Sequence, residues 1–98
     1  MEKRSPHTRL HIVQAMVAAG KVIATKSAVT AAADLGIDRE GMHAVIAGLT
    51  IKDFYKSMTT YNDHTVWQDV YLPVVDGVKL YVKVTVIDDV LIVSFKEK

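Results

Sequence analysis

The spacing of hydrophobic residues changes near the middle of the chain. In the first half they recur every three or four residues, as at Leu10, Val13 and Val17, which is the spacing of one face of an α-helix. In the second half they alternate with polar residues, most clearly over residues 79–87. Helices followed by an antiparallel meander are typical of the α+β class. The sequence therefore predicts about three helices packed on one face of a twisted, mainly antiparallel sheet.

The boundaries of these elements carry start and stop signals. A hydroxyl or carboxylate caps the free N–H groups at a helix start, proline is tolerated at the first helical position, and glycine ends a helix in a left-handed conformation. Three helices are expected, from Ser5-Pro6 to Gly20, from Thr25 or Ser27 to Gly36, and from Asp38 onward. Strands are expected at residues 22–24, 54–61, 66–71, 79–87 and 90–96, with turns at Asn62–His64, Asp76-Gly77 and Asp88-Asp89.

Chain length and composition exclude several classes of protein. The 98 residues contain no linker or repeat, so we expect residues 1–98 to form a single domain. The absence of cysteine excludes disulfide scaffolds, thiol nucleophiles and cysteine-based zinc sites. No secretory signal is evident, and no stretch approaches the roughly 18 apolar residues of a membrane-spanning helix. We therefore expect a cytoplasmic protein.

The polar side of the strand at residues 79–87 indicates a binding function. Residues two apart on a strand point the same way, so Tyr81 is expected between Lys79 and Lys83. An aromatic hydroxyl between two ammonium groups suits the phosphodiester backbone of RNA with a base stacked nearby. The same pattern also fits an ordinary solvent-facing strand whose lysines discourage pairing between sheet edges. Lys79 and Lys83 are therefore candidate RNA-binding residues.

Residues 53–71 are dense in polar and aromatic side chains. Lys56 and Gln68 fall on the two strands expected there, and His64 falls in the turn between them. Strict alternation would place Lys56 on one face with two apolar neighbours, which is not a polar face. Two explanations are possible. Lys56 lies at the edge of the core, or the strand twists or bulges at this residue.

The histidines offer little support for a metal centre. His7 and His11 are four residues apart on the expected first helix, but no HExxH pattern is present and no carboxylate completes a metal site. We therefore expect no metal and no other cofactor. His64 is the one histidine that lies near other candidate residues, and it is a candidate auxiliary group.

Residues 27–46 support a rival interpretation, because two helices joined across Gly36 have the pattern of a DNA-binding helix-turn-helix. The second helix would present Glu40 and alanines outward, with Arg39 and His43 at the margins. Base readout needs several Arg, Lys, Asn or Gln side chains, which this surface lacks. A helix-turn-helix regulator is still one possible function of the chain, and a non-catalytic RNA-binding module is another.

Three segments of the chain together resemble the MqsR toxins of bacterial type II toxin–antitoxin pairs: MEKRSPHTRL, DFYKSMTTYNDHTVWQDVY and TVIDDVLIVSFKEK. The resemblance covers the whole chain and implies an endoribonuclease that cuts messenger RNA at GCU-like sites without needing the ribosome. It also implies the RelE-like microbial ribonuclease fold. The implied partner is an MqsA-like antitoxin that binds zinc and DNA, and no direct DNA binding is expected of the toxin alone.

The resemblance also assigns site residues. The family's catalytic lysine, glutamine and tyrosine fall on Lys56, Gln68 and Tyr81. The chain departs from the family where other members carry arginines and a histidine, at Leu72, Val74 and Asp88. Fewer cations there imply weaker attraction for phosphate or a different RNA preference.

A metal-free mechanism is feasible because RNA carries its own nucleophile, the ribose 2′-hydroxyl. Its attack on the adjacent phosphate leaves a cyclic phosphate and a free 5′-hydroxyl, and it requires single-stranded RNA at the cut. Lys56 is expected to hold the phosphoryl oxygens, Gln68 to orient the substrate and Tyr81 to protonate the leaving oxygen. Flanking lysines also leave a base role open for Tyr81. The general base is left open among His64, Lys56 and Tyr81.

Overall fold

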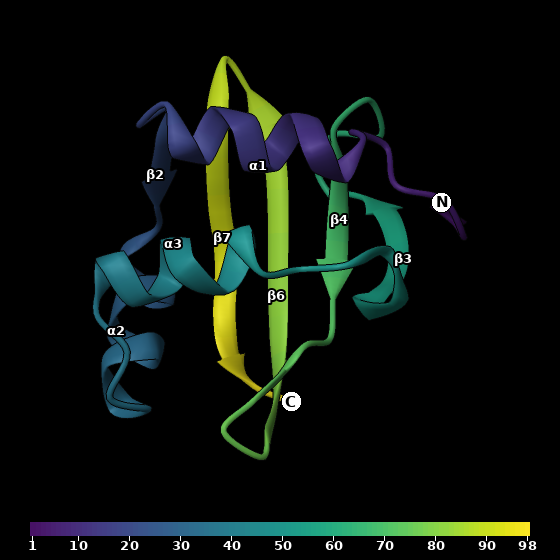
Figure 1. Ribbon diagram of the computed structural model, residues 1–98. Helices are drawn as coiled ribbons and strands as arrows, with labels where there is room; N and C mark the ends of the chain where they lie inside the picture. Colours follow the sequence, from purple (N-terminus) through teal and green to yellow (C-terminus); the bar gives the residue numbers. More distant parts are fainter.

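The computed structural model describes residues 1–98 as three helices and a seven-stranded sheet (Figure 1). The helices are α1 (Leu10–Ala18), α2 (Lys26–Asp34) and α3 (Arg39–Ala47), followed by a 3₁₀ turn at Ile51–Asp53. The strands are β1 (Glu2–Lys3), β2 (Val22–Ala24), β3 (Phe54–Thr59), β4 (Trp67–Tyr71), β5 (Val74–Val75), β6 (Val78–Ile87) and β7 (Asp89–Glu97). The prediction of an α+β fold is confirmed.

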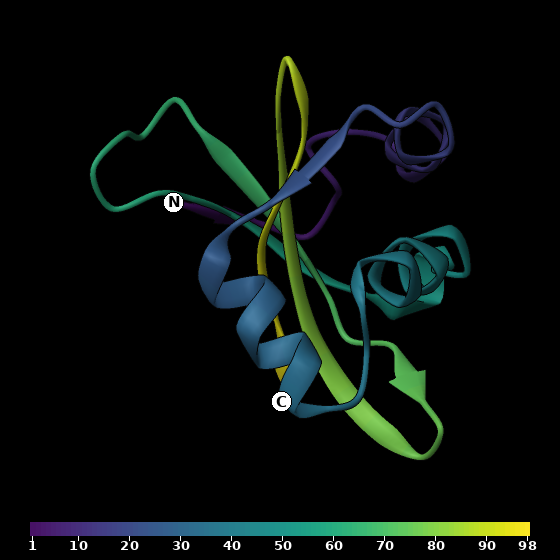
Figure 2. The ribbon, with the colours of Figure 1, turned by 90° about the vertical axis from the view of Figure 1, so that its left-hand side faces the viewer.

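The sheet is antiparallel except at one edge. Its strand order is β1-β3-β4-β6-β7-β2, with β5 paired to β6, and only β2 runs parallel to its neighbour β7. In Figure 1, α1 and α3 lie across one face of the sheet. Figure 2 shows α2 beside β7, near the edge that β2 occupies above it. All three helices contribute to one core, since Val13, Ala32 and Ile46 belong to the same buried cluster.

Two predicted helix caps are present. The Thr25 hydroxyl accepts a hydrogen bond from the Ala28 N–H at 3.1 Å, so Thr25 rather than Ser27 caps α2. The Asp38 carboxylate accepts from the Gly41 N–H at 2.8 Å and caps α3. Each side chain satisfies an N–H group that has no partner inside the helix.

The predicted start of the first helix is wrong. The helix begins at Leu10 rather than at Ser5-Pro6. The Asp69 carboxylate on β4 accepts hydrogen bonds from the N–H groups of His7 and Thr8, at 3.0 and 3.1 Å. Because these N–H groups are satisfied by the sheet, the segment before Leu10 gains nothing by extending the helix. This contact joins residues more than 60 positions apart, which no local signal could reveal.

Two irregularities in the sheet decide which way its side chains point. The register shifts between Phe54 and Lys56 on β3, and again in the β6–β7 hairpin, where Lys83 pairs with Ser94 but Val84 pairs with Ile92, which leaves Val93 of β7 without a partner on β6. The first shift is the bulge that was one of the two possibilities for Lys56. It leaves the Phe54 ring in edge contact with Tyr71 of the core, at a centroid distance of 5.5 Å, while Lys56 faces the other side.

The side of the sheet that faces away from α1 and α3 is called the open face below. Residues opposite one another on paired strands share a face, as do residues two apart on one strand. The register therefore places on the open face Lys56, Met58, Gln68, Val70, Tyr81, Lys83, Ser94 and Lys96.

The helix-turn-helix interpretation has no support in the packing of residues 27–46. Helix α2 packs against β7, whereas α3 packs on α1. Both bury apolar side chains in the sheet core, including Ala32 and Met42. None of the three helices combines the length and the apolar character that a membrane-spanning helix needs.

Candidate active site on the open face

Two adjoining hollows lie on the open face. The first has a volume of about 580 Å³ and is lined by Tyr55, Lys56, Tyr81, Lys83, Ser94, Lys96, Glu97 and Lys98. The second has a volume of about 690 Å³ and is lined by Met1, Met58, Thr59, Thr60, Tyr61, His64, Gln68 and Lys83. Lys83 belongs to both, so the two hollows meet at this residue.

Tyr81 lies among ammonium groups in the first hollow. The Nζ atoms of Lys96 and Lys83 are 5.5 and 6.0 Å from the centroid of its ring. Burial raises the pKa of Tyr81, and this effect outweighs the positive charge of Lys56, which lowers it. The Tyr81 side chain is therefore a neutral phenol at neutral pH, able to donate a proton.

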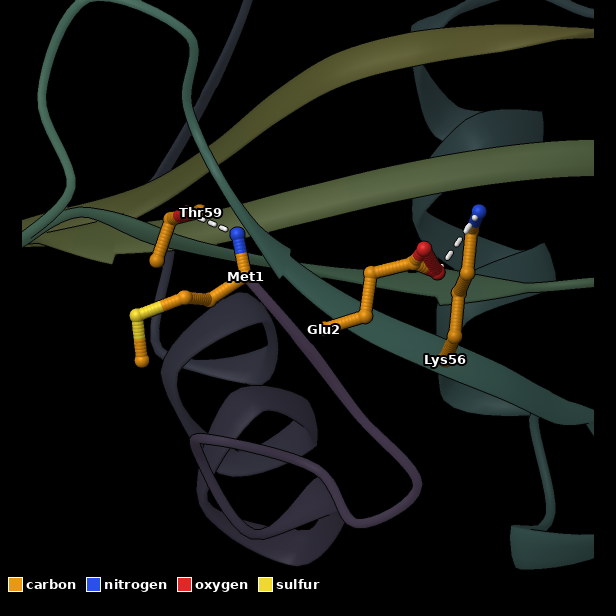
Figure 3. Close-up of polar contacts among 4 residues, drawn as sticks. All are labelled: Met1, Glu2, Lys56 and Thr59. Atoms are coloured by element: carbon orange, nitrogen blue, oxygen red, sulfur yellow. Dashed lines mark hydrogen bonds and ion pairs between the residues drawn. The ribbon is translucent and has the colours of Figure 1, made fainter.

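Lys56 is held by a carboxylate from the first strand. Figure 3 shows its ammonium paired with Glu2, with Nζ 3.0 Å from Oε1. The pairing follows from the register of β1 on β3, which sets Glu2 opposite Met58 on the open face. The hydrogen bond with Glu2 raises the pKa of Lys56, so this side chain remains a cation well above neutral pH. The Lys56 ammonium has three N–H donors, so it can hold the Glu2 carboxylate and a phosphate oxygen at the same time.

The first hollow carries an excess of positive charge. Burial lowers the pKa of Lys83, and the nearby charges of Lys96 and Lys56 lower it further. The Glu2–Lys56 contact is the only ion pair in the molecule, so Lys83 and Lys96 have no carboxylate partner. Ammonium groups that repel one another and lack acidic partners gain from binding an anion such as a phosphodiester.

The structure brings some of the predicted residues together and separates others. Lys56, Tyr81 and Lys83 line the first hollow. Gln68 and His64 line the second hollow instead. Lys79 is exposed on the same strand as Tyr81 but lines neither hollow.

Sequence reasoning missed Glu2 and Lys96. A strand of two residues has no periodicity to detect, and only its pairing with β3 brings Glu2 to Lys56. Lys96 lies opposite Tyr81 in the pairing of β6 with β7, and the register shift in this hairpin changes the alternation along β7. The alternation of Lys96 with its buried neighbour Phe95 is the signal in the sequence that could have found it.

His7, one of the two histidines considered for metal binding, has other contacts. The His7 ring stacks on Trp67, with a centroid distance of 5.6 Å and an interplanar angle of 17°. The Lys3 ammonium lies 4.2 Å from the centroid of the Trp67 ring and 3.0 Å from Nδ1 of His7. No group of three or more His, Cys, Asp or Glu side chains gathers anywhere in the molecule.

Comparison with known proteins places this chain in a family. The family model described as "Motility quorum-sensing regulator, toxin of MqsA" matches residues 5–97. The chain belongs to the MqsR toxin family. A relative, the mRNA interferase toxin MqsR of Escherichia coli (strain K12), is 61% identical over 98 residues, which are 100% of each chain. The family suggested by the three sequence segments is thereby confirmed.

The positions at which this MqsR-family chain departs from the expected pattern lie away from the hollows. Leu72, Val74 and Asp88 line neither of them. Asp88 lies between β6 and β7 with a positive φ of 64°, and the Val74 side chain is 62% exposed on the short strand β5. The charge of the first hollow therefore comes from other positions, chiefly the lysines of β3, β6 and β7.

Proposed function

We propose that this chain is the toxin of a type II toxin–antitoxin pair, and that it cuts single-stranded mRNA at GCU-like sites without a ribosome or a metal ion. The relative that is 61% identical over the whole chain is an mRNA interferase toxin. An mRNA interferase is an endoribonuclease. The observation that carries the proposal is the first hollow, where a neutral phenol stands among ammonium groups that attract phosphate.

Cleavage in this hollow starts from the 2′-hydroxyl of the nucleotide before the cut. Its oxygen forms a bond to phosphorus while the bond from phosphorus to the 5′-oxygen breaks. Lys56 neutralises the charge that develops on the phosphoryl oxygens, and Lys83 contributes to binding of the phosphate before the reaction. Tyr81 gives its proton to the departing 5′-oxygen, which its raised pKa favours, since the phenol keeps its proton at neutral pH.

The general base must be a group that has no proton at neutral pH. This requirement disfavours Lys56 and Tyr81, because the pKa of each is raised. The carboxylate of Glu2 meets it, since Lys56 lowers the Glu2 pKa and holds the group 3.0 Å from its own ammonium. The 2′-hydroxyl neighbours the phosphate, so a base next to Lys56 is well placed to accept its proton.

A comparison of two variants tests this assignment of the base. Glu2→Gln keeps the shape of the side chain and removes its basicity, so single-turnover cleavage is expected to fall by about 10²-fold or more. His64→Ala is the matched variant, because His64 was the other candidate among the expected residues. A fully active Glu2→Gln protein together with an inactive His64→Ala protein would move the base to His64.

The proposed activity is tested with purified protein and single-stranded RNA in the absence of ribosomes. We expect cleavage within GCU and not within permuted sequences, with 2′,3′-cyclic phosphate and 5′-hydroxyl ends. Cleavage should continue in EDTA. Loss of activity on chelation that magnesium restores would overturn the metal-free mechanism. Intact RNA with normal binding would instead support a non-catalytic RNA-binding module.

The proposed partner is an MqsA-like antitoxin, which the family description "toxin of MqsA" supports. Expression of this chain alone should arrest bacterial growth and degrade transcripts, and co-expression of the antitoxin should restore both. Continued growth with intact transcripts would count against the toxin assignment. A gel-shift assay with duplex DNA and the isolated chain should show no specific complex.

A further inference from the structure

The second hollow differs from the first in its chemistry. Four lysines line the first hollow, whereas Lys83 is the only lysine of the second. The second hollow offers the ring of Tyr61, the thioether of Met58 and the carboxamide of Gln68, and no carboxylate lines it. Its cationic groups are Lys83 and the α-ammonium of Met1, which donates to the Thr59 hydroxyl at 3.0 Å, so it has fewer of them than the first hollow. It has the flat apolar groups and the paired donor and acceptor that a nucleobase requires.

The position of the second hollow is that of a neighbouring nucleotide. The two hollows meet at Lys83, which binds the phosphate in the proposed mechanism. Gln68 lies opposite Met58 on the paired strands, and Lys56 lies two residues before Met58 on the same face. Diagonal neighbours on a sheet are roughly 7–8 Å apart. Gln68 is therefore a diagonal neighbour of Lys56 on the open face, and it lines the adjoining hollow rather than the first.

The loop between β3 and β4, which contributes Thr60, Tyr61 and His64 to the lining of this hollow, is held in shape by its own hydrogen bonds. The Asp63 N–H donates to the Thr60 hydroxyl at 3.0 Å, and that hydroxyl donates to the Asp63 carbonyl at 2.7 Å. The Asp63 carboxylate accepts from the Thr65 N–H at 2.8 Å. Tyr61 is 95% exposed on this loop, so its ring is free to stack on a ligand. A loop ordered before binding loses less entropy when a base enters.

We infer that the second hollow is a nucleobase subsite that determines sequence preference, with Tyr61 and Met58 against the plane of the base and Gln68 on its edge. The inference rests on the proposed ribonuclease function and deepens it. A glutamine carboxamide is both donor and acceptor, and it can make two hydrogen bonds to one base edge. Gln68 is then a specificity-determining residue, whereas the family resemblance alone places it with the catalytic group.

The test compares single-turnover cleavage of a GCU-containing oligonucleotide with that of three RNAs in which each base is replaced in turn. For Gln68→Ala we expect the preference at one position to fall by about 10- to 100-fold. The variant should lose preference because it cuts the GCU-containing RNA more slowly. It should cut the RNA whose base is replaced at that position as fast as the parent protein does. Tyr61→Ala should weaken binding of all RNAs by about 10-fold, because stacking is tolerant of base identity.

Two further variants make this test decisive. Gln68→Glu keeps the side-chain shape and removes the amide donor, so the preference should move toward bases that present an amino group at that position. Val74→Ala is the matched control, since Val74 is 62% exposed and lies outside both hollows. An equal slowing of every RNA by Gln68→Ala, or no change at all, would overturn the subsite. A parent protein that cuts none of the RNAs would overturn the proposed function itself.

Discussion

The two faces of strand β6 carry opposite properties on alternating residues. Leu80 and Val82 point toward the helices and are buried in the core. Tyr81 and Lys83, each one residue further along, line the first hollow on the open face. The same backbone therefore supports the core on one side and the proposed chemistry on the other. We expect substitutions on the open face to change activity and those on the covered face to change stability.

The largest effect is expected from Tyr81→Phe, which removes one hydroxyl from the open face. Single-turnover cleavage should fall by about 10²–10⁴-fold, the usual contribution of a positioned acid. The stability change should stay within about 0.5 kcal/mol, and RNA affinity should be nearly unchanged because the ring remains. Kinetics, binding and urea unfolding of this variant check all three. If the variant keeps full activity while Tyr81→Ala loses binding, Tyr81 is a stacking platform and not an acid.

The covered face should give the reverse result with Ile92→Ala. Ile92 is 0% exposed within the core cluster, so its truncation should lower the free energy of unfolding by about 2–5 kcal/mol. Cleavage by the fraction that stays folded should not change. Ile87→Ala is the matched control, because Ile87 is 57% exposed and its truncation should cost little. A loss of specific activity by folded Ile92→Ala protein would show that the two faces are not independent.

A smaller effect separates two lysines of the same strand. Lys83 touches both hollows and Lys79 touches neither, so Lys83→Ala should weaken RNA binding more than Lys79→Ala does. Each substitution removes at most one phosphate contact, which lowers the slope of log affinity against log salt by about one. Binding measured at several salt concentrations gives these slopes. Equal losses for the two variants would mean that RNA runs along the whole strand, and a large fall in maximal rate would make that lysine catalytic.

The smallest effect is expected in the core, from Tyr71→Phe. The Tyr71 hydroxyl is buried without a hydrogen-bond partner, so its removal should raise the free energy of unfolding by up to about 1 kcal/mol. Burial also raises the pKa of Tyr71. The free energy of unfolding of the parent protein should therefore fall as the pH rises above the ordinary tyrosine pKa of about 10, because the phenol then ionises in the unfolded state before it does so in the folded state. Between pH 8 and pH 11 the free energy of unfolding should fall less for Tyr71→Phe than for the parent protein. Tyr61→Phe, on the exposed loop, should show the same fall as the parent.

Local patterns determined much of the fold. Hydrophobic spacing was sufficient to predict the α+β class, and Asp38 as a helix cap could be read directly, because spacing and capping involve neighbouring residues. The alternation along β6 placed Tyr81 and Lys83 on one face before the sheet was known. Family resemblance, not local pattern, singled out Lys56 and Gln68 for the site.

Only the tertiary structure decided how these residues are grouped. A bulge after Phe54 turns Lys56 to the open face, and pairing of β1 with β3 brings Glu2 to its ammonium across more than 50 residues of sequence. The start of α1 was misread for the same reason, since the Asp69 carboxylate that replaces its first turn comes from a distant strand. Bulges, strand pairing and long-range hydrogen bonds depend on the whole sheet. Only the assembled sheet therefore places Tyr81 in the first hollow and Gln68 in the second, which no spacing in the sequence could indicate.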